Sequence, residues 1–479
     1  MSRSGVAFTL SAILGLSTGA CVDERVVFRD RELFTEPPAA AMSFLGYTDS
    51  TTKLTVCGNC HAGQQGDWVQ TAHGDAWVTL EASGSSQAFC EGCHTVNALG
   101  NAATGDAGYV AVAEPRYHDV QCESCHGPGL SHVQNPSETQ PLAPLSVGLD
   151  LTEGCGECHN GTHHPFVEEW EQSGHGQVIE SAAGREACYG CHTGENALDT
   201  WGIKWEYAER EEVLLGANAA TEHLPIACGV CHDPHSNEND GQLRFAIDIP
   251  SEEDNLCMKC HHKRGNPDPT TFRGPHSPEG PVLLGYGGWW PPNMNFPTDT
   301  IEATHSSSRN PRLCAGCHVQ RFEVTDAETG EFAFQATGHL FEAIPCLNAS
   351  GIPTPGDCEL TERTFRSCTG AGCHETEAIA RNLYVTVENR IALLVETLGD
   401  LIEQVPDAQD PDDGVYTTAE GSQFNYELAA NFAGSRIHNP ILIEALLTAS
   451  IQQMRTEYGL SVPSNVDLRN TLYLQRQGE

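Results

Sequence analysis

Nine clusters in the chain place two cysteines close together, with a histidine directly after the second cysteine. Eight of them read Cys-x-x-Cys-His, and the ninth, Cys368/Cys373/His374, has four residues between its cysteines. In such a motif the two thiols can add to the vinyl groups of a haem as thioethers, and the adjacent imidazole becomes the proximal ligand of the iron. The predicted attachment cysteines are Cys57, Cys60, Cys90, Cys93, Cys122, Cys125, Cys155, Cys158, Cys188, Cys191, Cys228, Cys231, Cys257, Cys260, Cys314, Cys317, Cys368 and Cys373. The predicted proximal ligands are His61, His94, His126, His159, His192, His232, His261, His318 and His374.

A single Cys-x-x-Cys pair is also typical of a zinc knuckle or of a redox-active dithiol. Neither of these alternatives requires a histidine directly after the second cysteine, and a dithiol oxidoreductase needs only one pair. Eight repeats of that adjacency therefore favour covalent haem, and we predict nine haem c groups. The ninth motif departs from the usual spacing, but His374 follows its second cysteine as in the others.

Three of the 21 cysteines lie outside these motifs, namely Cys21, Cys346 and Cys358. Cys346 and Cys358 are close together in a stretch rich in glycine and proline, so a disulfide is expected there, with two free thiols as the alternative. Thioether attachment and a disulfide both suit a compartment outside the cytoplasm.

The first twenty residues have the pattern of a signal peptide. Arg3 is followed by an apolar run over 6–16 and then by small residues over 17–20. Cys21 comes next, which makes it a candidate for lipidation, and ordinary cleavage after Ala20 is the alternative. No later apolar stretch is long enough to cross a bilayer, so a lipid on Cys21 is the membrane anchor that the sequence offers. We expect an exported protein that is periplasmic, outer-membrane-associated or extracellular.

The chain is strongly acidic, with 65 Asp and Glu against 25 Lys and Arg and a formal charge of −40. A chain of this charge will not bind nucleic acid through phosphates. It favours other redox proteins with basic contact surfaces as partners, although solubility alone explains the charge equally well.

The motifs are arranged in a repeat. Cys57 and Cys155 are 98 residues apart, as are Cys90 and Cys188, and the segment from Trp68 to His73 matches that from Trp170 to His175. We interpret the chain as two homologous three-haem modules followed by a third group of three motifs. The predicted divisions are a signal peptide over 1–20, an exposed leader over 21–50, modules over 51–145, 146–250 and 251–374, and a helical region over 375–479.

The last hundred residues change in character. Apolar residues recur at helical spacing over 375–404 and again over 439–458, with an acidic, proline-containing loop at 405–413 between them. We expect two long antiparallel helices packed against the last haems, and the alternative is a hairpin that serves only packing or dimerisation. Because hydrophobic residues make up only 39% of the chain, the haems themselves are expected to form much of the core. The predicted fold is mainly α with extensive irregular loop, wrapped around a chain of closely packed haems and ending in a helical hairpin.

Thirteen of the 22 histidines remain after the proximal ligands are assigned. Methionine is scarce, so histidine is the expected distal ligand at most or all irons. Nine histidines lie where a distal ligand is expected, and four others, His163, His164, His262 and His438, remain beyond them. The nine are His73, His118, His132, His175, His223, His235, His276, His305 and His339.

An iron with two histidine ligands passes electrons without exchanging ligands but does not readily bind a substrate. This favours electron transfer along the chain, between respiratory partners or to an extracellular acceptor. One alternative is an oxidoreductase of a small nitrogen or sulfur compound, in which one iron, with His374 the first to suspect, lacks a distal ligand. A further alternative is a subunit of a conductive filament, with haems stacked between copies of the chain.

Several segments resemble known multihaem proteins. The Trp68 to His73 segment together with Cys-Glu-Ser-Cys-His-Gly-Pro-Gly-x-x-His over 122–132 is similar to the tetrahaem cytochrome c family of ammonia-oxidising electron transfer. The segment over 274–281 and the one around His305 resemble the wider multihaem cytochrome c superfamily. The segment over 434–440 is similar to the region of multihaem nitrite and hydroxylamine enzymes that supplies a distal histidine, which implies that His438 is a tenth distal candidate. The resemblance implies closely spaced haems, but the Cys-x-x-Cys-Lys motif of the nitrite reductases is absent from this sequence.

Overall fold

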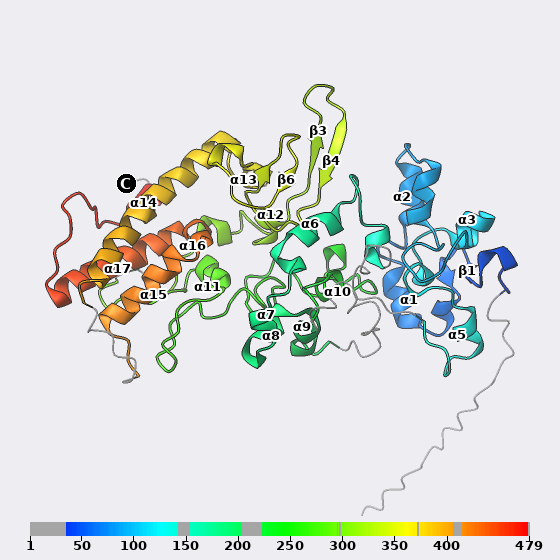
Figure 1. The fold of residues 1–479 in the computed structure, drawn as a ribbon, viewed down its shortest axis with the longest axis horizontal. Coiled ribbons are helices and arrows are strands. Elements are labelled where there is room, and N and C mark those ends of the chain that lie inside the picture. Colours follow the sequence, from blue (N-terminus) through cyan, green and yellow to red (C-terminus); the bar gives the residue numbers. More distant parts are fainter. Residues whose placement is uncertain are drawn as a thin grey trace, which may run out of the picture.

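The computed structural model describes residues 35–141, 154–203, 223–294, 296, 298–370, 373–405 and 414–477. These parts form an elongated molecule in which chain order follows the long axis (Figure 1). The first module lies at one end, the second module and part of the third occupy the middle, and the long C-terminal helices lie at the other end.

Short helices and very short strands make up most of the molecule. The first module contains β1 (Tyr47–Asp49), β2 (Leu54–Thr55), α1 (Ala62–Trp68), α2 (Ala76–Ala82), α3 (Gly108–Val112), α4 (Cys122–His126) and α5 (Leu130–Gln134). The second contains α6 (Phe166–Gln172), α7 (Glu180–Ala183), α8 (Glu186–His192), α9 (Gly194–Thr200) and α10 (Cys228–Cys231). The third contains α11 (Glu279–Leu284), α12 (Ala315–His318), β3 (Phe322–Thr325), β4 (Phe332–Ala336), β5 (Cys346–Leu347), β6 (Pro353–Thr354) and α13 (Arg366–Gly370). The C-terminal region contains α14 (Glu377–Ile402), α15 (Thr418–Ala430), α16 (Ala433–His438), α17 (Pro440–Tyr458) and α18 (Thr471–Gln477).

The strands form three separate antiparallel pairs, β1 with β2, β3 with β4, and β5 with β6. The β3–β4 hairpin projects from the middle of the molecule (Figure 1). The expectation of a mainly helical protein with much irregular chain is therefore confirmed.

The largest apolar core lies in the C-terminal helices. Side chains of α14, α15 and α17 form one cluster, in which Leu394, Leu398, Leu428 and Leu442 are fully buried. In the described parts of the three modules the apolar clusters contain only three to five buried residues each. A core this sparse matches the expectation that bound groups, rather than side chains, fill the interior of the modules.

The C-terminal region differs from the predicted hairpin because it contains a third long helix. The two predicted helices are present as α14 and α17, and α15 packs against both. The sequence of α15 lacks an apolar stripe because polar residues are buried on it: Ser422 and Asn425 are both buried, and Asn425 bonds to the backbone of Trp289. Thr417 and Glu420 begin the helix with a capping box.

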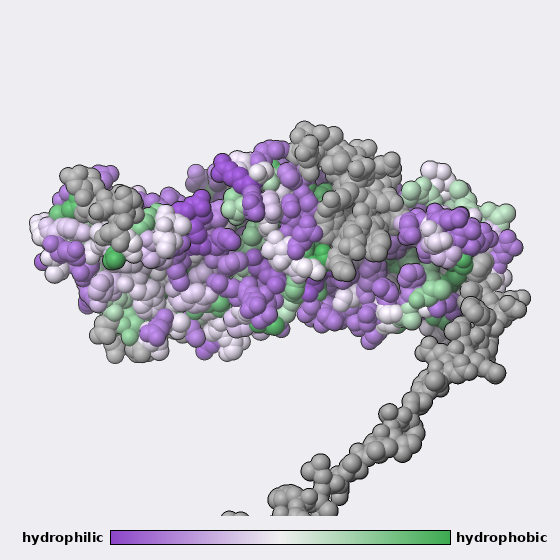
Figure 2. Space-filling view, turned by 90° about the horizontal axis from the view of Figure 1, so that it is seen from below, coloured by the Kyte–Doolittle hydropathy of each residue, from purple (hydrophilic) through white to green (hydrophobic). Residues whose placement is uncertain are grey.

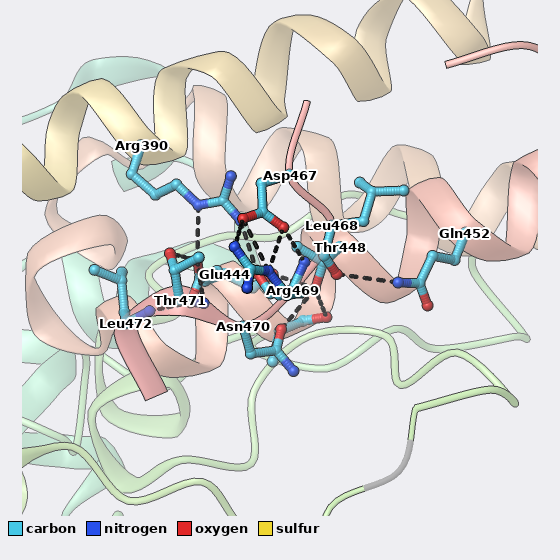
Figure 3. Close-up of polar contacts among 11 residues, drawn as sticks. Arg390, Glu444, Thr448, Gln452, Asp467, Leu468, Arg469, Asn470, Thr471 and Leu472 are labelled. Atoms are coloured by element: carbon cyan, nitrogen blue, oxygen red, sulfur yellow. Dashed lines mark hydrogen bonds and ion pairs between the residues drawn. The ribbon is translucent and has the colours of Figure 1, made fainter. Parts of the chain in front are cut away.

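A buried ion pair joins the C-terminal tail to this bundle. Glu444 of α17 is fully buried and accepts a hydrogen bond from Arg390 Nε of α14 at 2.7 Å. It also accepts from the backbone N–H of Thr471 and of Leu472, at 3.0 and 2.8 Å (Figure 3). One carboxylate therefore joins three helices, α14, α17 and α18.

The described end of the predicted leader, residues 35–50, is partly exposed and partly packed against the first module. Phe44, Leu45 and Tyr47 are buried, and the buried carboxylate of Glu123 accepts hydrogen bonds from the backbone N–H of Leu45 and Gly46. Residues 41–47 thus pack as part of the first module. The predicted signal peptide and Cys21 lie outside the described residues. Among the helices that the structure describes, none combines the length and the apolar character needed to span a bilayer.

One face of the molecule is mostly hydrophilic. The face drawn in Figure 2 is dominated by hydrophilic residues, with hydrophobic ones scattered between them. This is the surface expected of a chain with a formal charge of −40.

Cys346 and Cys358 are joined by a disulfide that closes a loop of twelve residues. The loop lies next to Ile344 and Arg363, both of which line the central cavity described below. Replacing both cysteines by serine should lower the free energy of unfolding by about 3 kcal/mol, because the unfolded chain regains the entropy that the crosslink removes. Chemical denaturation of the two proteins measures this difference, and equal midpoints would contradict it.

The sequence repeat has a structural counterpart. Trp68 Nε1 donates to the carbonyl of Val120 at 2.9 Å, and Trp170 Nε1 donates to the carbonyl of Ile226 at 2.9 Å. Each acceptor lies two residues before the first cysteine of a third motif. The equivalent tryptophan of each module, which follows its first motif, therefore bonds to the segment that leads into its third motif. The backbone N–H of Val120 and of Ile226 also donate to the carbonyls of His73 and His175, both at 3.1 Å.

Candidate haem-binding channel

A continuous cavity of about 3490 Å³ runs through the three modules. Shared among nine motifs, this is about 390 Å³ each, within the roughly 300–1,000 Å³ of ordinary ligand pockets. We call it the channel and number the motifs 1 to 9 in chain order. Eighteen histidines line it, nine from the motifs and nine from elsewhere. The second set is His73, His132, His164, His175, His235, His276, His305, His339 and His438.

The motifs share one local conformation, a single helical turn. The backbone N–H of the motif histidine donates to the carbonyl of the first cysteine at 2.9 Å in motif 1 and 3.0 Å in motif 7. This turn puts both thiols and the imidazole on one side of the backbone. In motif 9 the N–H of His374 reaches the carbonyl of Cys368 at 3.2 Å despite the two extra residues. The irregular motif thus closes in the same way as the regular ones.

Several histidines present one particular nitrogen to the channel. Nδ1 of His94, His132, His232, His305 and His318 lies 2.6–2.8 Å from a backbone carbonyl. A carbonyl can only accept, so Nδ1 carries the proton and Nε2 keeps its lone pair. An imidazole held through Nδ1 with Nε2 free is oriented as a metal ligand.

Desolvation keeps many of these rings neutral. Together with the charges of neighbouring histidines, it lowers the pKa of His175, His339 and His438 to about 4 and that of His159 to about 3. Neutral imidazole is the form that binds a metal, so these side chains need not lose a proton at pH 7.

Seven motif histidines face a second histidine across the channel at nearly constant distance. Two imidazoles bound on opposite sides of a metal, with bonds of about 2.0–2.1 Å, place their ring centroids roughly 6 Å apart. The observed centroid separations are 6.3 Å for His61–His132, 5.9 Å for His126–His235, 6.0 Å for His159–His73, 6.0 Å for His192–His276, 6.3 Å for His232–His339, 6.2 Å for His261–His175 and 6.1 Å for His318–His438. The residues present therefore fit a haem with two axial imidazoles at each of these motifs.

The other two motifs have a histidine of the second set as an electrostatic neighbour. His164 and His94 interact in this way, as do His305 and His374, and the ring centroid of His164 also lies 6.4 Å from that of His159. His305 is held by its Nδ1, which lies 2.8 Å from the carbonyl of Ile437.

Two of the predicted distal candidates lie away from the channel lining. His118 stacks on Trp77, with ring centroids 3.9 Å apart, and His223 Nδ1 lies 2.8 Å from a carboxylate oxygen of Glu195. His163, which stacks on Phe332, and His262 also lie outside the lining. His164, which sequence reasoning left unassigned, lies in the channel. Its position five residues after the motif 4 histidine was the available signal.

Facing histidines come mainly from different modules. His73 of the first module faces motif 4, and His175, its counterpart in the repeat, faces motif 7. Each copy of the repeated Trp-x4-His segment thus reaches the first motif of the next module. Histidines of one module therefore face motif histidines of the next, and this packing cannot be read from the order of the motifs in the sequence.

His339 is held in place by a buried carboxylate of the second module. Glu169 of α6 accepts from the backbone N–H of Thr337 at 2.9 Å, from its hydroxyl at 2.6 Å and from the backbone N–H of His339 at 2.7 Å. This carboxylate therefore joins the segment after the β3–β4 hairpin to α6, next to motif 6.

Replacing Glu169 by glutamine should lower the free energy of unfolding by about 1–3 kcal/mol, because an amide cannot accept all three bonds and leaves buried N–H groups unpaired. The low-spin spectrum assigned to motif 6 should broaden as His339 loses its fixed position. Glu171→Gln, on the same helix but exposed, is the matched control. Identical denaturation and spectra for both variants would refute the positioning role of Glu169.

His438 occupies a similarly constrained place. Asn439 is fully buried and donates to the carbonyls of Val282 and Ile301, at 3.0 and 2.6 Å, while its side-chain oxygen caps α17 at Leu442. These bonds fix the residue next to His438. The resemblance that singled out His438 therefore identified a side chain that faces motif 8.

Interactions between motif thiols show which motifs are neighbours. In five motif pairs a thiol of one motif shifts the pKa of a thiol of the other, which makes them close neighbours: Cys57 with Cys122, Cys93 with Cys158, Cys155 with Cys228, Cys191 with Cys260 and Cys257 with Cys314. Further thiols are electrostatic neighbours, Cys125 with Cys155, Cys231 with Cys257 and Cys317 with Cys368. Motifs 1, 3, 4, 6, 7, 8 and 9 therefore form one continuous series, with motif 2 beside motif 4 and motif 5 beside motif 7.

These features define the class of the protein: it is a multihaem c-type cytochrome that binds several haem c groups. Residues 56–127 match the family model for cytochrome c554 and c-prime, and residues 223–266 match the model for a doubled CXXCH motif. The first match covers most of module 1, where the resemblance to the tetrahaem family was noted.

Relatives are distant and only partly aligned. The chain is 24% identical over 240 residues to the C-type polyheme cytochrome OmcB of Geobacter sulfurreducens, a match that covers 48% of this chain and 24% of that protein. It is 23% identical over 235 residues to the multiheme cytochrome MtrA of Shewanella baltica, covering 44% of this chain and 59% of MtrA. It is 32% identical over 133 residues to cytochrome c-554 of Nitrosomonas europaea, covering 22% of this chain and 54% of c-554. The chain thus spans less than two thirds of each relative's length.

The fold has a counterpart among solved structures. The outer cell wall cytochrome OcwA superimposes with a TM-score of 0.54 at 16% identity, covering 86% of this chain and 100% of that chain. The two proteins therefore share a fold over most of their length.

Proposed function

We propose that the protein is an exported nonahaem cytochrome that carries electrons along a series of bis-histidine haems. When bound, each haem supplies a one-electron ferrous/ferric couple. The observation that carries the proposal is the set of seven histidine pairs with ring centroids 5.9–6.3 Å apart, all in one channel. In this assignment the remaining irons are ligated by His94 with His164 and by His374 with His305.

The chain's own residues set the order of the path. The proximity of their thiols connects motifs 1, 3, 4, 6, 7, 8 and 9 in sequence, and motifs 2 and 5 are side branches. The main series runs from the first module, at one end of the molecule, toward the third module and the C-terminal helices (Figure 1). Two histidines at each iron leave no open position, which supports relay rather than catalysis.

Export is supported by three independent features. They are the signal-peptide pattern over 1–20, thioether chemistry, and the disulfide between Cys346 and Cys358. The outer cell wall location that the name of OcwA gives for that protein agrees with export. The partners we propose are other redox proteins with basic contact surfaces, or an acceptor outside the cell.

Intact-protein mass spectrometry of the exported protein tests the haem count. The account predicts nine covalently bound haems, and Cys373→Ser should weaken attachment at motif 9 while leaving the other eight in place. A wild-type mass with eight haems would exclude motif 9 from the path. A mass with few or no haems would overturn the proposal.

A further inference from the structure

One short segment carries a net positive charge, although the chain as a whole is strongly negative. Residues 257–276 contain four basic residues and one acidic residue, whereas the whole chain has 25 basic and 65 acidic residues. A local positive region on a strongly negative protein attracts anions that the rest of the surface repels.

The basic residues of this segment surround motif 5. Lys263, Arg264 and Arg273 all line the channel, as does His276, which faces His192 of motif 5. The charge of Lys263 acts on the thiol of Cys191, and those of Arg264 and Arg273 act on His276. We call the side chains of Lys263, Arg264 and Arg273 the cationic rim.

Acidic groups lie near the rim but do not pair with it: Glu279 acts electrostatically on His276, and a carboxylate oxygen of Glu427 lies beside Gly274. None of the three rim side chains forms an ion pair with a described residue, and Lys263 and Arg273 are exposed. Asp268, the one acidic residue of the segment, accepts hydrogen bonds from Thr270 and Thr271 within its own turn. Two propionates of one haem would balance only two of the three charges.

The segment that carries the rim is fixed in place. Phe272 stacks on Tyr416 with ring centroids 4.9 Å apart, and Arg264 Nε donates to the carbonyl of Gly274 at 2.9 Å. Arg264 and Arg273 are thereby held close enough for their like charges to interact. Cations held together without carboxylate partners form a site prepared for a multiply charged anion.

We infer that the cationic rim binds a small, multiply charged anionic redox complex, and that motif 5 is a lateral site of electron exchange with it. The inference rests on the proposed function and adds the location and the charge of an acceptor. Motif 5 is suited to this role because it is a side branch beside motif 7, whose Cys260 is an electrostatic neighbour of Cys191. In the exchange one ferrous iron becomes ferric and the metal of the complex gains that electron, with no bond broken and no proton moved.

Binding is tested with hexacyanocobaltate(III), a redox-inert trianion, by calorimetry on the oxidised full-length holoprotein at low ionic strength. Lys263→Gln combined with Arg273→Gln should weaken binding at least about tenfold. The matched control, Arg455→Gln combined with Arg469→Gln, removes the same charge from exposed positions in the C-terminal region and should retain the wild-type affinity. Equal affinity in all three proteins, or equal weakening in both variants, would overturn the inference.

Electron transfer is tested with two one-electron oxidants of opposite charge. The rim variant, fully reduced, should be oxidised about tenfold more slowly than wild type by hexacyanoferrate(III), and no more slowly by hexaammineruthenium(III). Equal slowing with both oxidants would mean that the substitutions disturb motif 5 rather than an anion site. Failure of the proposed function would look different, because haem content would be low or neither oxidant would drain all the haems of the wild type.

Discussion

Replacing His73 by alanine should convert one haem of the protein from low-spin to high-spin. His73 faces His159 of motif 4 with ring centroids 6.0 Å apart, so the substitution removes one axial ligand from that iron. Motif 4 lies in the main series and is also a neighbour of motif 2, which makes it a junction of the proposed path. We therefore also expect electrons to pass more slowly between the two ends of the molecule.

The matched control is His118→Ala. The sequence predicts both His118 and His73 as distal ligands, but His118 stacks on Trp77 and lies outside the channel lining. Loss of that stacking should cost about 0.5–1.5 kcal/mol of stability without any change of spin state. Low-temperature EPR of the oxidised variants distinguishes them. A high-spin signal in His118→Ala, or its absence in His73→Ala, would contradict the assignment.

Replacing Glu444 by alanine should produce the largest loss of stability among the substitutions considered. Its carboxylate is fully buried and is bonded to Arg390, to the hydroxyl and N–H of Thr471, and to the N–H of Leu472 (Figure 3). Removing one partner of a buried ion pair leaves the other charge uncompensated, at a cost of about 3–5 kcal/mol. Because Glu444 joins α18 to the bundle, the C-terminal tail should also detach.

Thermal denaturation and limited proteolysis measure these two effects. Asp467→Asn is the matched control, since Asp467 pairs with Arg469 at the surface, where solvent screening leaves an ion pair with little effect on stability. A Glu444→Ala protein that is as stable as the Asp467→Asn protein, with an equally protected tail, would show that the buried pair contributes nothing to the bundle.

The attachment motifs could be predicted from sequence because their chemistry is local. Two thiols and an imidazole within five or seven consecutive residues define each one, and the helical turn that arranges them needs no distant partner. The same holds for α14 and α17, whose apolar positions recur at helical spacing. In each case the information lies within one short segment.

The facing histidines could not be paired from sequence because each pair depends on how the modules pack. His159 and His73 are 86 residues apart, and His232 and His339 are 107 apart. His118 and His164 show most clearly why sequence cannot identify the facing histidines. In the folded chain His118 stacks on Trp77, whereas His164 lines the channel. Helix α15 was missed for a related reason: Ser422 and Asn425 are buried where an apolar stripe would be expected, and Asn425 is satisfied by bonds to Trp289 and Ser450.

Low-temperature EPR of the oxidised wild-type protein, with haem content determined on the same sample, tests the central claim most directly. The account predicts nine haems for each chain and only low-spin signals, because every iron has two histidine ligands. A high-spin component equivalent to about one haem, shifting on addition of nitrite, hydroxylamine or sulfite, would contradict it, since that iron would be open to substrate and the protein would be an oxidoreductase.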